Sequence, residues 1–169
     1  MKQTIPVTQN QTMASECNDK TAISHIQFDP PSNTGTFLPR ILMFCCNWCS
    51  YAGADLAGVS RFQYPPSVRI IRVMCSGRVD PAFILEGFRR GADGILLTGC
   101  HIGDCHYLKG NEYTRDRMIH IKPLLQSVGI DPRRFRLEWI SASEGRKFAD
   151  IVIEFTETIQ KLGPLKLKE

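Results

Sequence analysis

No run of apolar residues in this chain approaches the roughly 20 that a helix needs to cross a bilayer. The first 20 residues, MKQTIPVTQNQTMASECNDK, also lack the apolar segment of a secretory signal. We therefore expect a cytoplasmic protein that does not associate with membranes. The formal net charge is only +4, which gives no support to a nucleic-acid partner.

The sequence has little that indicates catalytic machinery. No Gly-x-Gly-x-x-Gly fingerprint follows the first apolar run, and no Walker loop is present. No pair of carboxylates and no Ser-His-Asp arrangement stands out as a hydrolytic site. We therefore expect no independent catalytic site in this chain.

What the chain does contain is cysteine. Seven cysteines are unusual in 169 residues without a secretory signal. In such a chain they point to metal binding or redox chemistry before structural disulfides. They are Cys17, Cys45, Cys46, Cys49, Cys75, Cys100 and Cys105.

The hydrophobic pattern divides the chain into two parts. Residues 1–38 are rich in Thr, Ser, Asn, Gln and Pro, and their apolar residues follow no period. This composition predicts an extended N-terminal arm. Residues 39–169 have regular hydrophobic patterns and form the predicted folded domain, an α/β unit that holds six of the seven cysteines.

Strands and helices are expected to alternate within residues 39–169. Apolar or β-branched runs predict strands over residues 41–44, 68–74, 94–98 and 135–140. Helical spacing predicts helices over residues 52–59, 82–90 and 113–128, the last with a kink at Pro123. The pattern predicts a small doubly wound parallel sheet of about four strands, with helices on both faces.

A fourth, longer helix is expected at the C-terminal end of the domain. Ser141 and Glu144 have the S-x-x-E spacing of a capping box, and one apolar face follows at helical spacing. The predicted face consists of Phe148, Val152, Phe155, Ile159 and Leu162.

The cysteines follow the predicted strands. Cys46 and Cys49 come after the first strand, Cys75 after the second, and Cys100 and Cys105 after the third. The carboxyl ends of parallel strands lie along one edge of a sheet, where ligands of open α/β folds bind. We therefore expect these five thiols to converge at that edge.

Spacing alone leaves several uses of these thiols open. Soft thiolates select zinc, copper(I) or iron–sulfur, and four of them suit either a structural zinc or a 2Fe–2S cluster. Cys46-x-x-Cys49 before a helix also fits a thiol–disulfide oxidoreductase. We expect Cys45 to be a buried core thiol and Cys17 an incidental free thiol. Cys75 fits a core, ligand or redox role.

Three other side chains lie next to the cysteines. His101 and His106 directly follow Cys100 and Cys105. We expect them beside the metal ligands or on the surface, because adjacent residues rarely bind one metal together. Trp48 fits three roles: shielding a cluster from water, covering an interface, or packing in the core.

Four segments make the sequence recognisable: FCCNWCSYAGADLAGVSR (44–61), YPPSVRIIRVMCSGRVDP (64–81), GADGILLTGCHIGDCHYLKGN (91–111) and EWISASEGRKF (138–148). Together they closely resemble the delta, iron–sulfur subunit of methyl-viologen-reducing hydrogenase, which is associated with the heterodisulfide reductase complexes of methanogens. The resemblance covers about residues 40–169. The long N-terminal extension departs from the family pattern.

The resemblance implies an electron-transfer subunit with one 2Fe–2S cluster per chain. Such a subunit passes electrons from a hydrogenase, or in some members a formate dehydrogenase, to the flavin-bearing subunit of an electron-bifurcating heterodisulfide reductase in methanogenesis. The family's recurring cysteines correspond to Cys46, Cys49, Cys75, Cys100 and Cys105. We expect Cys46, Cys49, Cys100 and Cys105 to be the ligands, with Cys75 as the alternate. The alternative functions are a zinc-stabilised structural adaptor and a thiol–disulfide oxidoreductase that uses Cys46 and Cys49.

Overall fold

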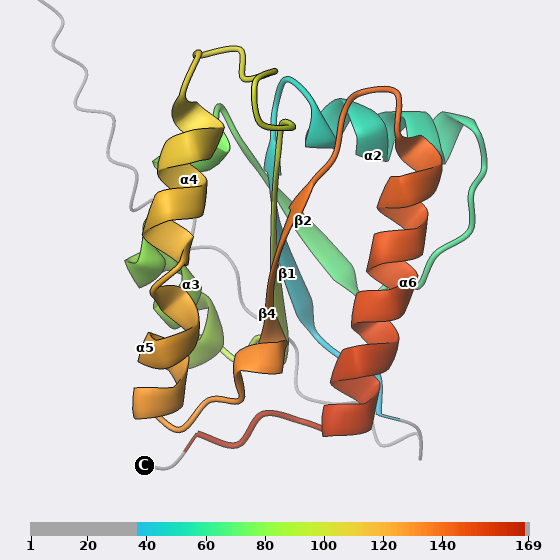
Figure 1. Ribbon diagram of the computed structural model, residues 1–169. Helices are drawn as coiled ribbons and strands as arrows, with labels where there is room; N and C mark the ends of the chain where they lie inside the picture. Colours follow the sequence, from blue (N-terminus) through green and yellow to red (C-terminus); the bar gives the residue numbers. More distant parts are fainter. Residues whose placement is uncertain (1–36, 168–169) are drawn as a thin grey trace, which may run out of the picture.

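A four-stranded, all-parallel sheet forms the centre of the domain (Figure 1). The computed structural model describes residues 37–167, so nearly all of the predicted N-terminal arm, residues 1–38, lies outside the described residues. The strands are β1 (Ile41–Cys46), β2 (Val68–Val73), β3 (Gly94–Gly99) and β4 (Phe135–Trp139). They lie in the order β2-β1-β3-β4, which confirms the predicted parallel α/β fold.

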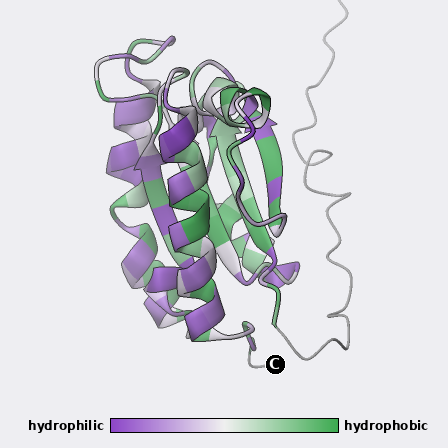
Figure 2. Ribbon diagram, turned by 90° about the vertical axis from the view of Figure 1, so that its right-hand side faces the viewer, coloured by the Kyte–Doolittle hydropathy of each residue, from purple (hydrophilic) through white to green (hydrophobic). Residues whose placement is uncertain are grey.

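Helices cover both faces of the sheet, so the domain has three layers (Figure 1). One face packs against α2 (Ser50–Val59) and α6 (Gly145–Leu162). The other packs against α3 (Pro81–Arg89), α4 (Gly110–Met118) and α5 (Ile121–Ser127). In Figure 2 the strands are mostly green, and purple is concentrated on the helices.

The central strand β1 shows how the two cores form. Its side chains alternate between the two faces, and all six of its residues are buried. Ile41 and Met43 belong to the core under α2 and α6, whereas Leu42 and Phe44 belong to the core under α3, α4 and α5. A strand buried on both faces reads as a continuous apolar run, which is the pattern found in its sequence.

The order in which strands are added across the sheet reverses between β1 and β3, although all strands stay parallel. From β1 the chain crosses to β2 on one side, and it then returns to place β3 on the other side of β1. Such a switch point opens a crevice at the carboxyl ends of the two strands, because the following connections leave in opposite directions. The residues that follow β1 and β3 therefore line this crevice.

The predicted helix over residues 113–128 is wrong as a single kinked helix. The structure has two helices, α4 and α5, separated at Ile119 and His120. Pro123 lies in the first turn of α5, where its missing N–H is not needed for a helical hydrogen bond. A proline inside a continuous helix would instead clash with the carbonyl of the preceding turn, so the chain stops and restarts.

The amino end of the sheet is closed by a buried carboxylate. Asp93, which is fully buried, accepts hydrogen bonds from Arg40 N (2.9 Å) and Leu165 N (2.9 Å) and forms an ion pair with the Arg40 guanidinium (3.1 Å). The backbone carbonyl of Asp93 also accepts from Arg134 Nη1 (2.9 Å). The starts of β1 and β3 and the segment after α6 are thus held together.

Helix α6 packs closely against the sheet at Gly94. A Cβ on Gly94 would lie 2.7 Å from Ile159 Cγ1 and 3.1 Å from Phe155 Cε1, both in buried side chains. Four residues of the predicted apolar face, Phe148, Val152, Phe155 and Ile159, are buried in this core, and Leu162 packs at its margin.

We predict that Gly94→Ala destabilises the domain by about 1–3 kcal/mol, because the added methyl forces Ile159 and Phe155 to shift in a filled core. Gly58→Ala is the matched control, since a Cβ there meets nothing within 4 Å on the exposed side of α2. That change should stabilise the helix by about 0.5–1 kcal/mol. Denaturant unfolding of both variants measures the difference, and equal free energies of unfolding would contradict the proposed close packing.

Candidate metal centre

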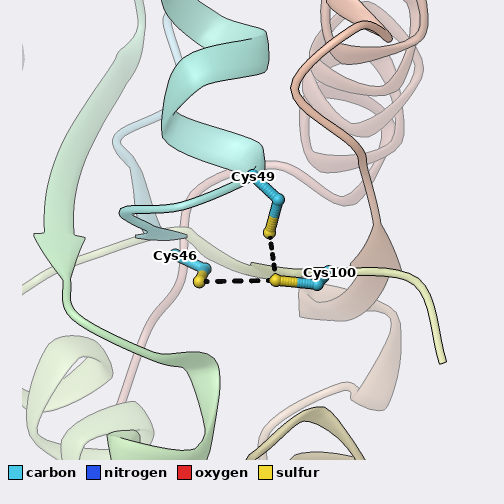
Figure 3. A group of neighbouring side chains, drawn as sticks. All are labelled: Cys46, Cys49 and Cys100. Carbon is cyan, nitrogen blue, oxygen red and sulfur yellow. Dashed lines mark hydrogen bonds between the residues drawn. The ribbon is translucent and has the colours of Figure 1, made fainter. Parts of the chain in front are cut away.

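Three cysteines meet at the carboxyl ends of β1 and β3, at the switch point (Figure 3). Cys46 is the last residue of β1, Cys49 is the N-cap residue of α2, and Cys100 directly follows β3. Their Sγ atoms all lie within 4.8 Å of one another, and all three side chains are buried. The expected convergence of thiols separated by more than fifty residues is therefore present for this group.

The sulfur positions fit soft-metal ligation. Cys46 Sγ lies 3.8 Å from Cys100 Sγ, and the Cys49 thiol donates to Cys100 Sγ at 2.6 Å. Sulfurs bound at about 2.3 Å to one tetrahedral metal lie about 3.8 Å apart. The Cys46–Cys100 pair has this separation, whereas the sulfurs of Cys49 and Cys100 lie closer together.

Cys75 and Cys105 form a second pair at the same edge. Their Sγ atoms are 4.0 Å apart, and the Gly77 N–H donates to Cys75 Sγ at 3.4 Å. Gly110, the first residue of α4, makes room for both sulfurs: a Cβ there would collide with Cys75 Sγ and lie 3.1 Å from Cys105 Sγ. Burial raises the pKa of Cys75 to about 11, and the negative charges of Cys105 and Cys46 add to this effect, so the pair lies within electrostatic range of Cys46.

Crowding of the three buried sulfurs sets their protonation. Hydrogen bonds from Cys100 and then from Cys49 lower the pKa of Cys46 to about 2. Donation to Cys46 raises the pKa of Cys100 to about 12, and donation to Cys100 raises that of Cys49. Cys46 therefore loses its proton readily, whereas Cys49 and Cys100 resist deprotonation, because several negative charges would lie together in a buried site. A bound cation removes this obstacle, since metal binding deprotonates its thiol ligands.

Helix ends add positive potential at the same edge. The N-terminus of α2 begins next to Cys49, and that of α4 begins at Gly110 beside Cys75 and Cys105. Backbone N–H groups at a helix N-terminus carry partial positive charge, which stabilises thiolates. The fold therefore supports an anionic thiolate group at this position.

Cys45 is separate from the site, as expected. Although it is adjacent to Cys46, it points into the opposite side of β1, where it is fully buried in the core with Met43 and accepts a hydrogen bond from Thr98 Oγ1. Burial raises the pKa of Cys45 to about 12, so this thiol stays neutral. Cys17 lies outside the described residues.

The two histidines have other partners within the described chain. His101 Nε2 lies 2.6 Å from Glu144 Oε2, and His106 stacks on Trp48 with ring centroids 3.8 Å apart. Both arrangements agree with the expectation that they lie beside the cysteines. Trp48 is 44% exposed, so the core-packing interpretation of this residue is wrong.

Glu144 joins the loop after β3 to the start of α6. Its carboxylate accepts a hydrogen bond from Ser141 N at 2.7 Å, which is one half of the predicted capping box. This bond and that of His101 lower the pKa of Glu144 to about 2. The helix itself begins at Gly145, one turn later than a cap at Ser141 would give.

Asn111 is a site residue that the sequence patterns did not reveal. Its side chain is fully buried, and its amide donates to the carbonyls of Cys100 (3.1 Å) and His101 (2.5 Å). These bonds fix the backbone that carries Cys100. The only signal was its position beside Gly110 at the end of a cysteine loop, which did not distinguish it from a solvated asparagine.

Within residues 37–167, none of the helices combines the length and the apolar character required to span a bilayer.

Comparison with known proteins supports the resemblance drawn from the motifs. A family model described as methyl-viologen-reducing hydrogenase, delta subunit, matches residues 41–163. The vhc iron-sulfur subunit of the F420-non-reducing hydrogenase of Methanococcus voltae is 54% identical over 131 residues, covering 78% of this chain and 91% of that protein. The iron-sulfur subunit of the F420-non-reducing hydrogenase of Archaeoglobus profundus is 53% identical over 130 residues, covering 77% and 95%.

A third relative has a different organisation. It belongs to the ferredoxin:CoB-CoM heterodisulfide reductase of Methanosarcina mazei and is 46% identical over 127 residues. The match covers 75% of this chain but only 16% of that protein. In that relative, a domain similar to this chain is thus part of a much longer polypeptide.

We predict that Glu144→Ala lowers the free energy of unfolding by about 1 kcal/mol, because Ser141 N–H loses its acceptor at the start of α6. Glu157→Ala, an exposed position on the same helix, should change stability by less than about 0.5 kcal/mol. Denaturant unfolding at neutral pH distinguishes the two. Equal losses would show that the carboxylate of Glu144 has no special role at the helix start.

Proposed function

This chain belongs to the family of methyl-viologen-reducing hydrogenase delta subunits, and on that premise we propose that it is an electron-transfer subunit carrying one 2Fe–2S cluster. The observation that carries this proposal is the convergence of buried Cys46, Cys49 and Cys100 at the switch point, with Cys75 and Cys105 beside them. A bound 2Fe–2S cluster would supply one-electron transfer. The chain's own residues would hold the iron, exclude water and donate hydrogen bonds to the sulfurs.

Several features of the site support a cluster over a simple thiol pair. The Gly77 N–H donates to Cys75 Sγ at 3.4 Å, and the backbone N–H groups of Trp48 and Ser76 add to the hydrogen bonds from Cys100 and Cys49 that lower the pKa of Cys46. Such bonds stabilise anionic sulfur and help to set the potential of iron–sulfur centres. The names of the two hydrogenase relatives, which include the words iron-sulfur subunit, favour iron over zinc.

The fourth ligand is a choice between Cys75 and Cys105. We propose Cys105, the ligand expected from the sequence analysis, with Cys75 as the alternate, because the resemblance includes both cysteines. Both sulfurs face the same space beneath Gly110. The fifth thiol would then lie next to the cluster without ligating it.

We further propose a position for the chain between two redox partners. The relatives named as hydrogenase subunits indicate a hydrogenase as the electron donor, and a formate dehydrogenase is the alternative donor. The relative named as part of a heterodisulfide reductase supports such an enzyme as the acceptor, and we propose that its flavin-bearing subunit receives the electrons. That flavin would bifurcate electrons in methanogenesis, and this chain would deliver them one at a time.

The direct test is to measure iron, acid-labile sulfide and zinc on anaerobically purified full-length protein. We expect about two irons and two sulfides per chain, because four thiolates fit a 2Fe–2S centre. Zinc without sulfide would replace electron transfer with the structural-adaptor function. A metal-free protein that reduces disulfides through Cys46 and Cys49 would support the oxidoreductase alternative.

Variants identify the ligands. Cys100→Ser should abolish or distort the visible spectrum of the cluster, because Cys100 contacts both other thiols of the buried group. Cys45→Ser is the matched control and should leave the spectrum unchanged, since that side chain lies in the core. A bleached Cys45→Ser protein that remains folded would contradict the assignment.

Cys105→Ser and Cys75→Ser separate the two candidates for the fourth ligand. We expect iron loss or an altered electron paramagnetic resonance spectrum for Cys105→Ser, and full iron occupancy for Cys75→Ser. The reverse result would assign the fourth position to Cys75.

A further inference from the structure

Every loop that carries a cysteine of the site also exposes a large apolar side chain. Trp48 lies between Cys46 and Cys49 and is 44% exposed, and Met74 precedes Cys75 and is 56% exposed. The loop after β3 exposes Ile102 (43%), Tyr107 (48%) and Leu108 (82%). We call these five residues the apolar rim. Such a gathering around a buried site is typical of an interaction surface.

Three aromatic rings organise the rim before any partner binds. The Trp48 and His106 rings are stacked at 3.8 Å with planes 14° apart, and Tyr107 meets both of them edge-on. Trp48 Nε1 also donates to Tyr107 Oη at 3.3 Å. The loop after β1 is thereby fixed to the loop after β3. Rigid, exposed aromatic side chains of this kind lose little conformational entropy on binding.

Leu108 has an unfavourable backbone conformation and a highly exposed side chain. Its φ is 66°, in the left-handed region that a non-glycine residue adopts at a cost in free energy, and its side chain is the most exposed of the rim. The Leu108 N–H donates to the Cys105 carbonyl at 2.9 Å, which holds the turn. The strained turn therefore presents a leucine to solvent directly beside the site.

The rim is also the side from which the cysteines are reached. The sheet core closes the site from below, because Cys46 ends a strand that is buried on both faces. Above it, the loops that carry the rim form the boundary with solvent (Figure 1). A partner that exchanges electrons with the site must approach closely, and this boundary offers the shortest approach.

A second open face has a different character. A hollow of about 600 Å³ beside the edge strand β4 is lined by Arg115, Lys122, Arg133, Arg136 and Glu138 above apolar side chains. Stable, permanent interfaces are depleted in charged residues at their centre, whereas transient ones are more polar. The apolar rim therefore suits a lasting partner better than the hollow beside β4 does.

We propose that the apolar rim is the docking face for the electron acceptor, the flavin-bearing heterodisulfide reductase subunit; this inference rests on the function proposed above. The choice of the acceptor follows from the relative in which a similar domain makes up 16% of a heterodisulfide reductase polypeptide. Partners joined in one polypeptide are permanently associated, which calls for the apolar type of interface. The hydrogenase then contacts another face.

The test uses the full-length, metal-loaded protein and the isolated acceptor subunit. Leu108→Lys and Ile102→Lys place a charge in the rim, and Val59→Lys is the matched control on an apolar side chain that is 77% exposed at the end of α2. We expect the Kd for the acceptor to rise at least tenfold for the two rim variants and to stay within twofold for Val59→Lys. Iron and sulfide per chain, and reduction by hydrogenase under hydrogen, should stay unchanged in all three.

Leu108→Gly separates docking from folding. Glycine adopts positive φ without strain, so this variant should melt at the same or a higher temperature while binding the acceptor several-fold more weakly. A lower melting temperature with unchanged acceptor binding would show that Leu108 is structural and would overturn the proposal.

The remaining outcomes are also decisive. Unchanged acceptor binding in both lysine variants, or no binding by the wild-type protein, would overturn the docking face. Loss of hydrogenase-driven reduction with intact acceptor binding would assign the rim to the donor instead. A wild-type protein without iron and sulfide would refute the proposed cluster, while the binding comparison would still decide the rim.

Discussion

The rest of the site depends on the pairing of β1 with β3. Because the two strands are parallel neighbours, their carboxyl ends stop side by side, and Cys46 and Cys100 meet although they are 54 residues apart. The connections after β1 and β3 leave toward opposite sides of the sheet, which leaves space at these strand ends. Cys49, the N-cap residue of α2, lies at the same place. Backbone hydrogen bonding within the sheet thus assembles thiols that would otherwise repel one another as anions.

The same constraint explains why the topology and the convergence of cysteines were predictable. Continuous apolar runs such as residues 41–44 identify strands buried on both faces, and alternation with helical patterns requires a parallel sheet. In a parallel sheet, a cysteine that directly follows a strand must lie at the edge formed by the carboxyl ends of the strands. No side-chain detail is needed for that step, and the structure agrees with it for Cys46, Cys49 and Cys100.

What the sequence did not reveal depends on tertiary contacts. Helical spacing over residues 113–128 continues through Pro123, but only the folded chain decides whether a proline bends a helix or begins a new one. The exposure of Trp48 is similar, because an aromatic residue among cysteines is compatible with a core or a surface until its neighbours are known. Gly110 and Asn111 act through a close approach and two buried hydrogen bonds, neither of which leaves a periodic pattern.

The two ends of the sheet differ in how their buried polar groups are stabilised, as the buried Asp93 beside the start of β3 shows. At the amino end of the sheet, Arg40, Arg134 and Leu165 are held to Asp93 by groups that the chain supplies itself. At the carboxyl end, hydrogen bonding among the buried thiols raises the pKa of Cys49 and Cys100, and a bound cation would offset this effect. Insertion of the proposed cluster would therefore change the balance of charge at one edge of the sheet only, because the chain's own side chains already pair the buried charge at the opposite edge.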